Sequence, residues 1–210
     1  RIPPDRWLAD YITTYIQRDV REVVNVTDLR TFTTFVKLCA GRTANEVNLS
    51  ALAGDAGITH NTAKAWLSVL ETGFLCTPIP AWYRNLRKQL VKRPKLHFYD
   101  SGLVCALLGI SSPDQLRHHP LRGAIFESWV VSEIVKARHH AGQAAAVSHF
   151  RESRGLEVDV VLERDGTLVL VEARSGATAH AEQLGPLLRL SELLERHDPS
   201  TAIERVLVYG

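Results

Sequence analysis

The chain has no methionine, few cysteines and no long apolar run. A natural reading frame begins with methionine, so we expect this 210-residue chain, which opens on Arg1, to be part of a longer protein. Its three cysteines, Cys39, Cys76 and Cys105, lie far apart without metal-ligand spacing, which favours reduced thiols in a cytoplasmic protein. No apolar run reaches the roughly 18 residues of a membrane span and no secretory signal is visible, so we expect a soluble protein without a membrane partner.

Acidic residues are absent between Glu71 and Asp100, although the whole chain has a net charge of only +2. Such a local excess of positive charge is expected for contact with nucleic-acid phosphates, and it also suits docking on an acidic protein. We expect nucleic-acid contact through the six basic residues of this stretch, which are Arg84, Arg87, Lys88, Lys92, Arg93 and Lys95.

A helix-turn-helix pattern precedes the basic stretch. Asn48 or Ser50 can cap a short helix, Gly57 supplies a turn, and Thr59 can cap a longer helix. Two aromatic-rich runs around the basic stretch could pair as the wing of a winged helix. The same pattern also occurs as plain scaffolding in helical domains, and only one cation lies on the second helix. The residues that this helix is expected to turn outward are His60, Asn61, Ala63 and Lys64.

Two strand-like runs, residues 157–162 and 168–174, meet at Asp165-Gly166. Asp-Gly between β-branched runs predicts a two-residue hairpin, because the turns that match strand twist need positive φ at both central residues. In that register Asp159 faces Glu172, and Glu157 faces Arg174. Side chains alternate between the two faces of a strand, so all four are expected on one side of the sheet.

Carboxylates opposed across a hairpin repel unless a cation lies between them. Mg²⁺ held by Asp159 and Glu172 would remove the repulsion and would suit metal-assisted phosphodiester hydrolysis. The alternative is a solvated strand face on which Arg174 or another basic residue neutralises the acids. Glu127 offers a third carboxylate, since it lies at the margin of the apolar stripe of a predicted helix, where an unpaired charge is costly.

The order of predicted elements gives an α+β protein with two parts. Residues 1–110 form a helical region with a helix-turn-helix at about 48–74 and a wing at about 78–99. Residues 121–210 alternate helix and strand, which predicts an α/β module with a mixed sheet.

Several motifs occur in an order that resembles one family, the domain of unknown function 4143. They include residues 49–53, 94–103, 123–127, 157–159 and 172–175, and the resemblance runs from about Trp7 to Tyr209. This domain follows the P-loop module in a large group of prokaryotic AAA-type ATPases. The resemblance implies a winged-helix part followed by a restriction-endonuclease-like part. The chain has no Gly-x-x-x-x-Gly-Lys-[Ser/Thr] motif, so ATP would bind only to the full-length protein.

In nuclease folds of that kind, a helical Glu, a strand Asp and a Glu-x-Lys motif form the catalytic site. The resemblance places these roles at Glu127, Asp159 and Glu172, with Arg174 in the lysine's position. Arginine stays protonated at physiological pH, so Arg174 could stabilise charge on a phosphate but could not act as a general base.

Three functions follow from these patterns. The first is an accessory region of an ATPase that contacts nucleic acid and carries a nuclease-like site of little or no activity. The second is a protein-interaction or oligomerisation module with a degenerate nuclease fold. The third is a Mg²⁺-dependent nuclease. The expected partners are nucleic acid, the protein's own N-terminal ATPase module and a second copy of the chain.

Overall fold

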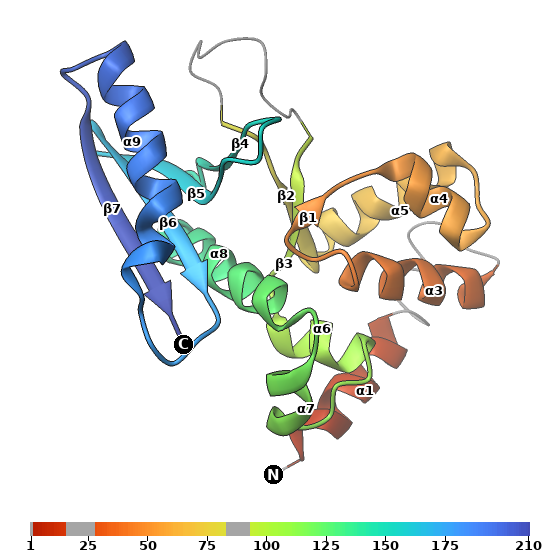
Figure 1. The fold of residues 1–210 in the computed structure, drawn as a ribbon. Helices are drawn as coiled ribbons and strands as arrows, with labels where there is room; N and C mark the ends of the chain where they lie inside the picture. Colours follow the sequence, from red (N-terminus) through yellow and green to blue (C-terminus); the bar gives the residue numbers. More distant parts are fainter. Residues whose placement is uncertain (1, 16–27, 83–92) are drawn as a thin grey trace. The chain divides into compact units, whose positions relative to one another are not determined.

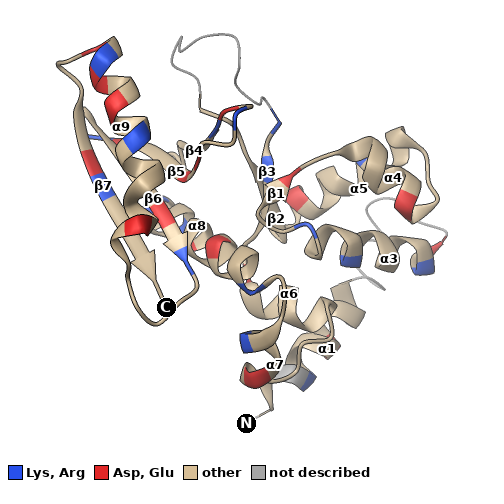
Figure 2. Ribbon diagram, in the orientation of Figure 1, with Lys and Arg blue, Asp and Glu red and all other residues tan. Residues whose placement is uncertain are grey.

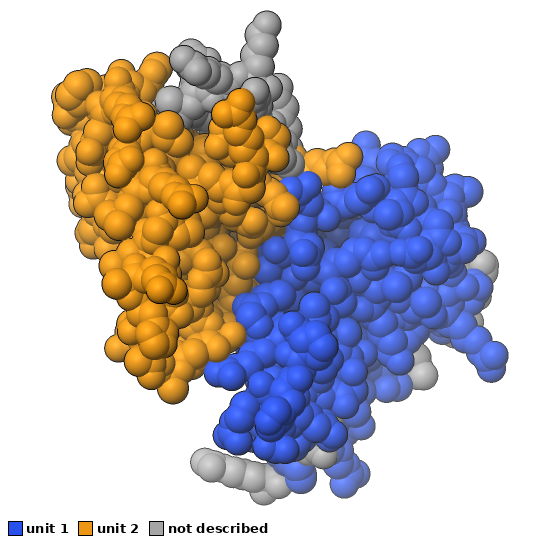
Figure 3. All heavy atoms as spheres, viewed as in Figure 1, with its two compact units in different colours: residues 1–78, 96–125 blue, residues 79–95, 126–210 orange. Residues whose placement is uncertain are grey.

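The computed structural model describes residues 2–15, 28–82 and 93–210 (Figure 1). Helices and two separate sheets make it an α+β protein, as the sequence predicts. The chain divides into two compact units, coloured separately in Figure 3: unit 1 contains residues 1–78 and 96–125, and unit 2 contains residues 79–95 and 126–210. In the ranges described, no helix has the length and apolar character needed to cross a membrane.

The first part of the chain is mainly helical. Its three short strands form one sheet in the order β1-β3-β2. The elements in chain order are α1 (Pro4–Thr14), α3 (Leu29–Ala40), β1 (Asn45–Glu46), α4 (Leu49–Ala56), α5 (His60–Thr72), β2 (Cys76–Ile79), β3 (Lys95–Phe98), α6 (Ser101–Leu107) and α7 (Pro113–His118).

Local capping interactions set the bounds of α4 and α5. The Asn48 side chain accepts a hydrogen bond from the backbone N–H of Ala51 at the start of α4. Gly57 ends α4 with φ at +67°, a conformation that glycine adopts without a steric penalty. The Thr59 hydroxyl then accepts from the N–H of Thr62 and caps α5. The predicted helix, glycine turn and helix are therefore confirmed.

Aromatic packing fixes the orientation of α5 in unit 1. Trp66 lies edge-on to Phe32 and Phe35 of α3, with ring centroids 5.1 and 5.5 Å apart. Both phenylalanines are fully buried, and Leu70 on the same side of α5 is also buried. Because this side of α5 packs inward, the opposite side of the helix faces solvent.

Unit 2 is built on a four-stranded mixed sheet in the order β4-β5-β6-β7, which confirms the predicted mixed sheet. The first three strands pair antiparallel, whereas β6 and β7 pair in parallel, and the crossover between them contains η2 and α9. The elements are α8 (Arg122–His140), β4 (Val147–Arg151), β5 (Glu157–Arg164), β6 (Thr167–Arg174), η2 (Ala181–Leu184), α9 (Gly185–His197) and β7 (Ala202–Tyr209).

The β5-β6 hairpin has the predicted turn and register. Asp165 and Gly166 have φ values of +52° and +77°, as a two-residue primed turn requires. Arg164 pairs with Thr167, and the register continues to Val160 and Val171. The pairing therefore brings the acidic ends of the two strands together.

Helix α9 covers one face of this sheet (Figure 1). Its buried residues Leu187 and Leu190 belong to one apolar cluster with Val161 and Leu170 of the hairpin. Side chains two residues apart on a strand share a face. Asp159 and Glu172 follow Val161 and Leu170 at this spacing, so the charged residues continue the face on which α9 packs.

Candidate functional site

A buried lysine lies among the carboxylates of unit 2. Lys95, the first residue of β3, is only 1% exposed. Its Nζ lies 2.7 Å from Oε1 of Glu127 and 3.8 Å from Oδ1 of Asp159, and it also forms an ion pair with Oε1 of Glu157. Lys95 is predicted to contact nucleic acid together with the other basic residues, but its burial among carboxylates contradicts that prediction. Three carboxylates supply the compensating charge that a buried ammonium needs.

Arg174 provides the second cation of the cluster. Its Nη2 pairs with Oε1 of Glu172, and its Nη1 lies 4.0 Å from Oδ2 of Asp159. The backbone N–H of Ala173 also donates to Oδ2 of Asp159, at 2.9 Å. In Figure 2 acidic and basic colours lie next to each other near the end of β6. Basic residues thus pair with the opposed acids, as one alternative in the sequence predicts, but Asp159 and Glu172 are buried and do not form the solvated strand face of that alternative.

The structure brings together the four residues that the nuclease resemblance implies. Glu127, Asp159, Glu172 and Arg174 all line one hollow of about 490 Å³. The segment before β5 and the start of α9 complete its wall. The remaining lining residues are Gly155, Leu156, Glu157, Glu182, Gly185, Pro186 and Arg189.

Burial and mutual repulsion change the protonation of these groups. Burial, with the nearby charge of Asp159, raises the pKa of Glu127 and of Glu172 to about 8. Burial alone would lower the pKa of Lys95, but the carboxylates around it outweigh this effect and raise that pKa. Burial opposes ionisation of Glu157 as well, yet the Lys95 ammonium lowers its pKa. Burial therefore favours the protonated forms of Glu127 and Glu172, whereas the nearby cations Lys95 and Arg174 favour their ionised forms.

The pair Asp159 and Glu172, predicted to hold Mg²⁺, does not fit a metal in this arrangement. Both oxygens of Asp159 already face cations or an N–H group, and Oε1 of Glu172 is paired with Arg174. The remaining oxygen, Oε2 of Glu172, is buried without a hydrogen-bond partner. Within the described ranges, no group of three or more His, Cys, Asp or Glu side chains is placed to hold a metal ion. A metal at this pair would first have to displace Arg174.

Besides Lys95, the residues predicted to contact nucleic acid fall into three groups. His60, Asn61 and Lys64 are exposed on α5. Ala63 is fully buried, so the prediction that it faces outward is wrong, because it shares the inner side of α5 with Trp66. Arg93 is exposed just before β3. Four of the basic residues, Arg84, Arg87, Lys88 and Lys92, lie outside the described residues.

Glu157 and His149 belong to the surroundings of Lys95 but have no role in the sequence predictions. Glu157 is predicted on the correct face, opposite Arg174, yet its partners are Lys95 and Arg151. His149 is fully buried, and burial lowers its pKa to about 4, so the imidazole is neutral at physiological pH. Its Nδ1 lies 3.2 Å from the carbonyl oxygen of Ile79. The motif at residues 157–159 includes Glu157 but does not indicate its pairing with Lys95, because that partner lies far away in the sequence.

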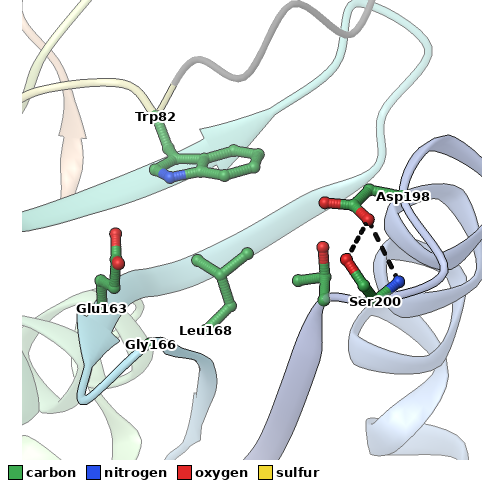
Figure 4. Close-up of a pocket in the computed structure, with 7 residues that line it drawn as sticks. Trp82, Glu163, Gly166, Leu168, Asp198 and Ser200 are labelled. Atoms are coloured by element: carbon green, nitrogen blue, oxygen red, sulfur yellow. Dashed lines mark hydrogen bonds between the residues drawn. The ribbon is translucent and has the colours of Figure 1, made fainter.

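A second hollow of unit 2, about 420 Å³, lies beside the Asp165-Gly166 turn (Figure 4). The Trp82 ring and the Glu163 carboxylate face it, and Oδ1 of Asp198 accepts hydrogen bonds from the N–H and hydroxyl of Ser200. None of its lining residues is a buried charged group. The carboxylate and lysine cluster is therefore the stronger candidate site.

The two parts of this α+β chain match two families whose functions are unknown. Residues 2–114, more than half of the chain, match the model of a domain of unknown function, DUF8612, and the chain belongs to this family. Residues 122–209 match a second domain of unknown function, DUF4143. The family predicted from the motifs is thus confirmed for the C-terminal part. The motifs suggest a resemblance that begins at about Trp7, but the match to DUF4143 begins at residue 122.

Two curated relatives are also of unknown function. They are the uncharacterized proteins Rv2008c of Mycobacterium tuberculosis and Mb2031c of Mycobacterium bovis. Each is 24% identical over 160 residues, which cover 76% of this chain and 35% of the relative. The chain therefore spans about a third of the length of these relatives. No solved structure matches it.

Proposed function

We propose that the chain is an accessory region of a longer AAA-type ATPase and contacts nucleic acid through a winged helix in its first part. The order of elements carries this proposal: α3, β1, α4, α5, β2 and β3, with the strands arranged β1-β3-β2. This is the order of a helix-turn-helix followed by a two-stranded wing, with α5 as the recognition helix. The matched residues cover only 35% of each relative, which leaves room for an ATPase module elsewhere in a longer polypeptide.

The exposed side of α5 supplies suitable groups for nucleic acid. Asn61 can donate and accept hydrogen bonds at base edges, and Lys64 can contact a phosphate. β2 and β3 are neighbours in the sheet, and in the sequence the basic stretch lies between them and ends at the first residue of β3. Arg93 belongs to unit 2 and is exposed just before β3, where it offers a separate phosphate-contacting group.

Unit 2 would then be a restriction-endonuclease-like module with little or no cleavage activity. Its carboxylates lie in one hollow, but Lys95 and Arg174 neutralise them. A nuclease that uses Mg²⁺ needs carboxylate oxygens that are free to bind the metal. In this arrangement such oxygens are occupied by internal ion pairs.

Fluorescence anisotropy with labelled duplex DNA tests the nucleic-acid contact. Phosphate contacts release counterions, so affinity should fall steeply between about 50 mM and 200 mM salt. Lys64→Ala and Arg93→Ala should each weaken binding and reduce the salt slope by about 1. Lys37→Ala, at an exposed lysine on α3, is the matched control and should leave binding unchanged. Salt-independent binding, or equal losses in Lys37→Ala and Lys64→Ala, would refute the proposal.

A metal-dependent nuclease is the second candidate, favoured by the convergence of Glu127, Asp159 and Glu172 on one hollow. Plasmid nicking with Mg²⁺ or Mn²⁺ that is lost in Asp159→Ala would support it. If the position of the amine limits activity, Arg174→Lys should increase nicking. Absence of nicking in both the natural chain and Arg174→Lys would eliminate this candidate.

A further inference from the structure

The hollow of about 420 Å³ beside the hairpin turn shares no lining residue with the hollow of the carboxylate and lysine cluster. Small-ligand pockets in proteins have volumes of about 300–1,000 Å³, so it has room for a small group. An aromatic ring and two carboxylates reach it from three parts of the chain, at Trp82, Glu163 and Asp198 (Figure 4). The other lining residues are Gly166, Leu168, Ser200 and Thr201.

Both the backbone and the ring of Trp82 are held in place. Its backbone N–H donates to the carbonyl oxygen of His149 in β4, at 2.7 Å. The indole lies edge-on to Phe150, with ring centroids 6.5 Å apart, and packs against the apolar cluster under α9. The residue is nevertheless only partly buried. Trp82 therefore presents a fixed aromatic surface to the hollow.

Two carboxylates give the hollow a negative charge. Glu163, near the end of β5, is exposed and forms no ion pair with another described residue. Asp198 follows α9, and its Oδ1 accepts hydrogen bonds from the N–H and hydroxyl of Ser200. These neutral donors orient the Asp198 carboxylate but do not cancel its charge. Among the described residues that line the hollow there is no lysine or arginine to balance the two acids.

We propose that this hollow binds an organic cation, which is the guanidinium or ammonium group of a basic side chain or of a polyamine. The face of an indole ring attracts cations, and the carboxylates of Glu163 and Asp198 add Coulomb attraction. Trp82 and Leu168 offer apolar surface and no oxygen ligands, so an organic cation suits the hollow better than a hard metal ion. The same carboxylates repel phosphate, so the site is separate from nucleic-acid contact and does not depend on it.

Heteronuclear NMR of the indole N–H groups of the 210-residue chain tests the proposal. Trp82→Phe assigns the Trp82 signal. The probes are the N-acetyl methylamides of arginine and of citrulline, which is the neutral isostere of arginine. The arginine probe should shift the Trp82 signal saturably and bind at least about tenfold more tightly than the citrulline probe. Trp129, which is 43% exposed and does not line the hollow, should keep its signal.

Glu163→Gln removes one carboxylate of the hollow. Because Glu163 is exposed, this variant should fold as the natural chain does. It should bind the arginine probe at least about threefold more weakly, since exposed charge pairs contribute modestly. The matched control is Glu192→Gln, at a 65% exposed side chain of α9 outside the hollow, and it should bind as tightly as the natural chain.

Spermidine, a free polyamine, is the third probe and distinguishes the two sources of the cation. Tighter binding of the arginine probe would assign the hollow to a polypeptide side chain, and tighter binding of spermidine to a free polyamine. Absence of a saturable Trp82 shift with either cation would overturn the proposal. So would equal affinities of the arginine and citrulline probes, equal shifts of Trp82 and Trp129, or binding that Glu163→Gln does not weaken.

Discussion

Replacing Lys95 with methionine should destabilise unit 2 strongly. The Lys95 side chain is 2% exposed, and those of Glu127 and Asp159 are 14% and 6% exposed. Removing one partner of a buried ion pair leaves an uncompensated charge and costs about 3–5 kcal/mol. Here the carboxylates can take up protons, because the pKa of Glu127 is already raised to about 8. We therefore expect a loss of about 3 kcal/mol near neutral pH.

Hydrogen exchange of the β5 and β6 amides should measure this loss, because it reports on unit 2 separately from unit 1. Urea unfolding of the same samples gives an independent free energy. The loss should shrink in acid, where protons neutralise the carboxylates that Lys95 normally compensates.

The matched control is Lys136→Met on α8. Lys136 pairs with Glu133 at the surface, with the two side chains 40% and 49% exposed. Exposed ion pairs of this kind contribute less than about 1 kcal/mol. If Lys95→Met costs no more than Lys136→Met, the buried cluster does not stabilise unit 2 and the reasoning fails.

Three further changes should be measurable by urea unfolding. Burial raises the pKa of Glu127 from 4.5 to about 8. The protonated carboxyl therefore contributes its full stability below pH 4.5, and this stability is lost as the pH rises through about 8. Glu127→Gln should make the free energy of unfolding depend less on pH in this range. Gly166→Ala should cost about 1 kcal/mol because φ is +77°, whereas Gly176→Ala, in open space without positive φ, should cost little. Leu190→Ala should cost about 2–5 kcal/mol, and Leu188→Ala, at a 47% exposed residue, much less.

Each of these comparisons has a clear contrary result. A pH profile that Glu127→Gln leaves unchanged would show that this carboxyl does not take up a proton on folding. Equal costs at Gly166 and Gly176 would mean that the turn does not require positive φ. Equal costs at Leu190 and Leu188 would contradict the packing of α9 on the sheet.

The hairpin register could be predicted from the sequence because it depends on local rules. Two adjacent residues, Asp165 and Gly166, determine the turn, and alternation along each strand then places Asp159 opposite Glu172. The caps of α4 and α5 follow from contacts within three residues, and they too could be predicted. Ala63 was misplaced because an alanine can lie on either side of a helix without changing its apolar pattern.

The position of Lys95 could not be predicted from its neighbours. It ends a run of basic residues, and such runs are normally solvated. Its partners Glu127 and Asp159 are far along the chain, and the folded arrangement alone shows that they compensate its charge. The sequence therefore indicated that the acids need a cation, but it did not indicate which lysine supplies it.

Unit 2 is discontinuous in sequence, and this affects how the protein can be dissected. Residues 79–95 belong to it and contribute both Lys95 and the bridge between Ala81 and His149. A truncated chain that starts near residue 121 would retain Glu127, Glu157 and Asp159 without the ammonium that pairs with them. It would also lack the segment whose carbonyl oxygens contact the imidazole of His149 and accept a hydrogen bond from its backbone N–H. If such a shortened protein is unstable, the cause would be the missing residues 79–95 and not an inherently unstable sheet.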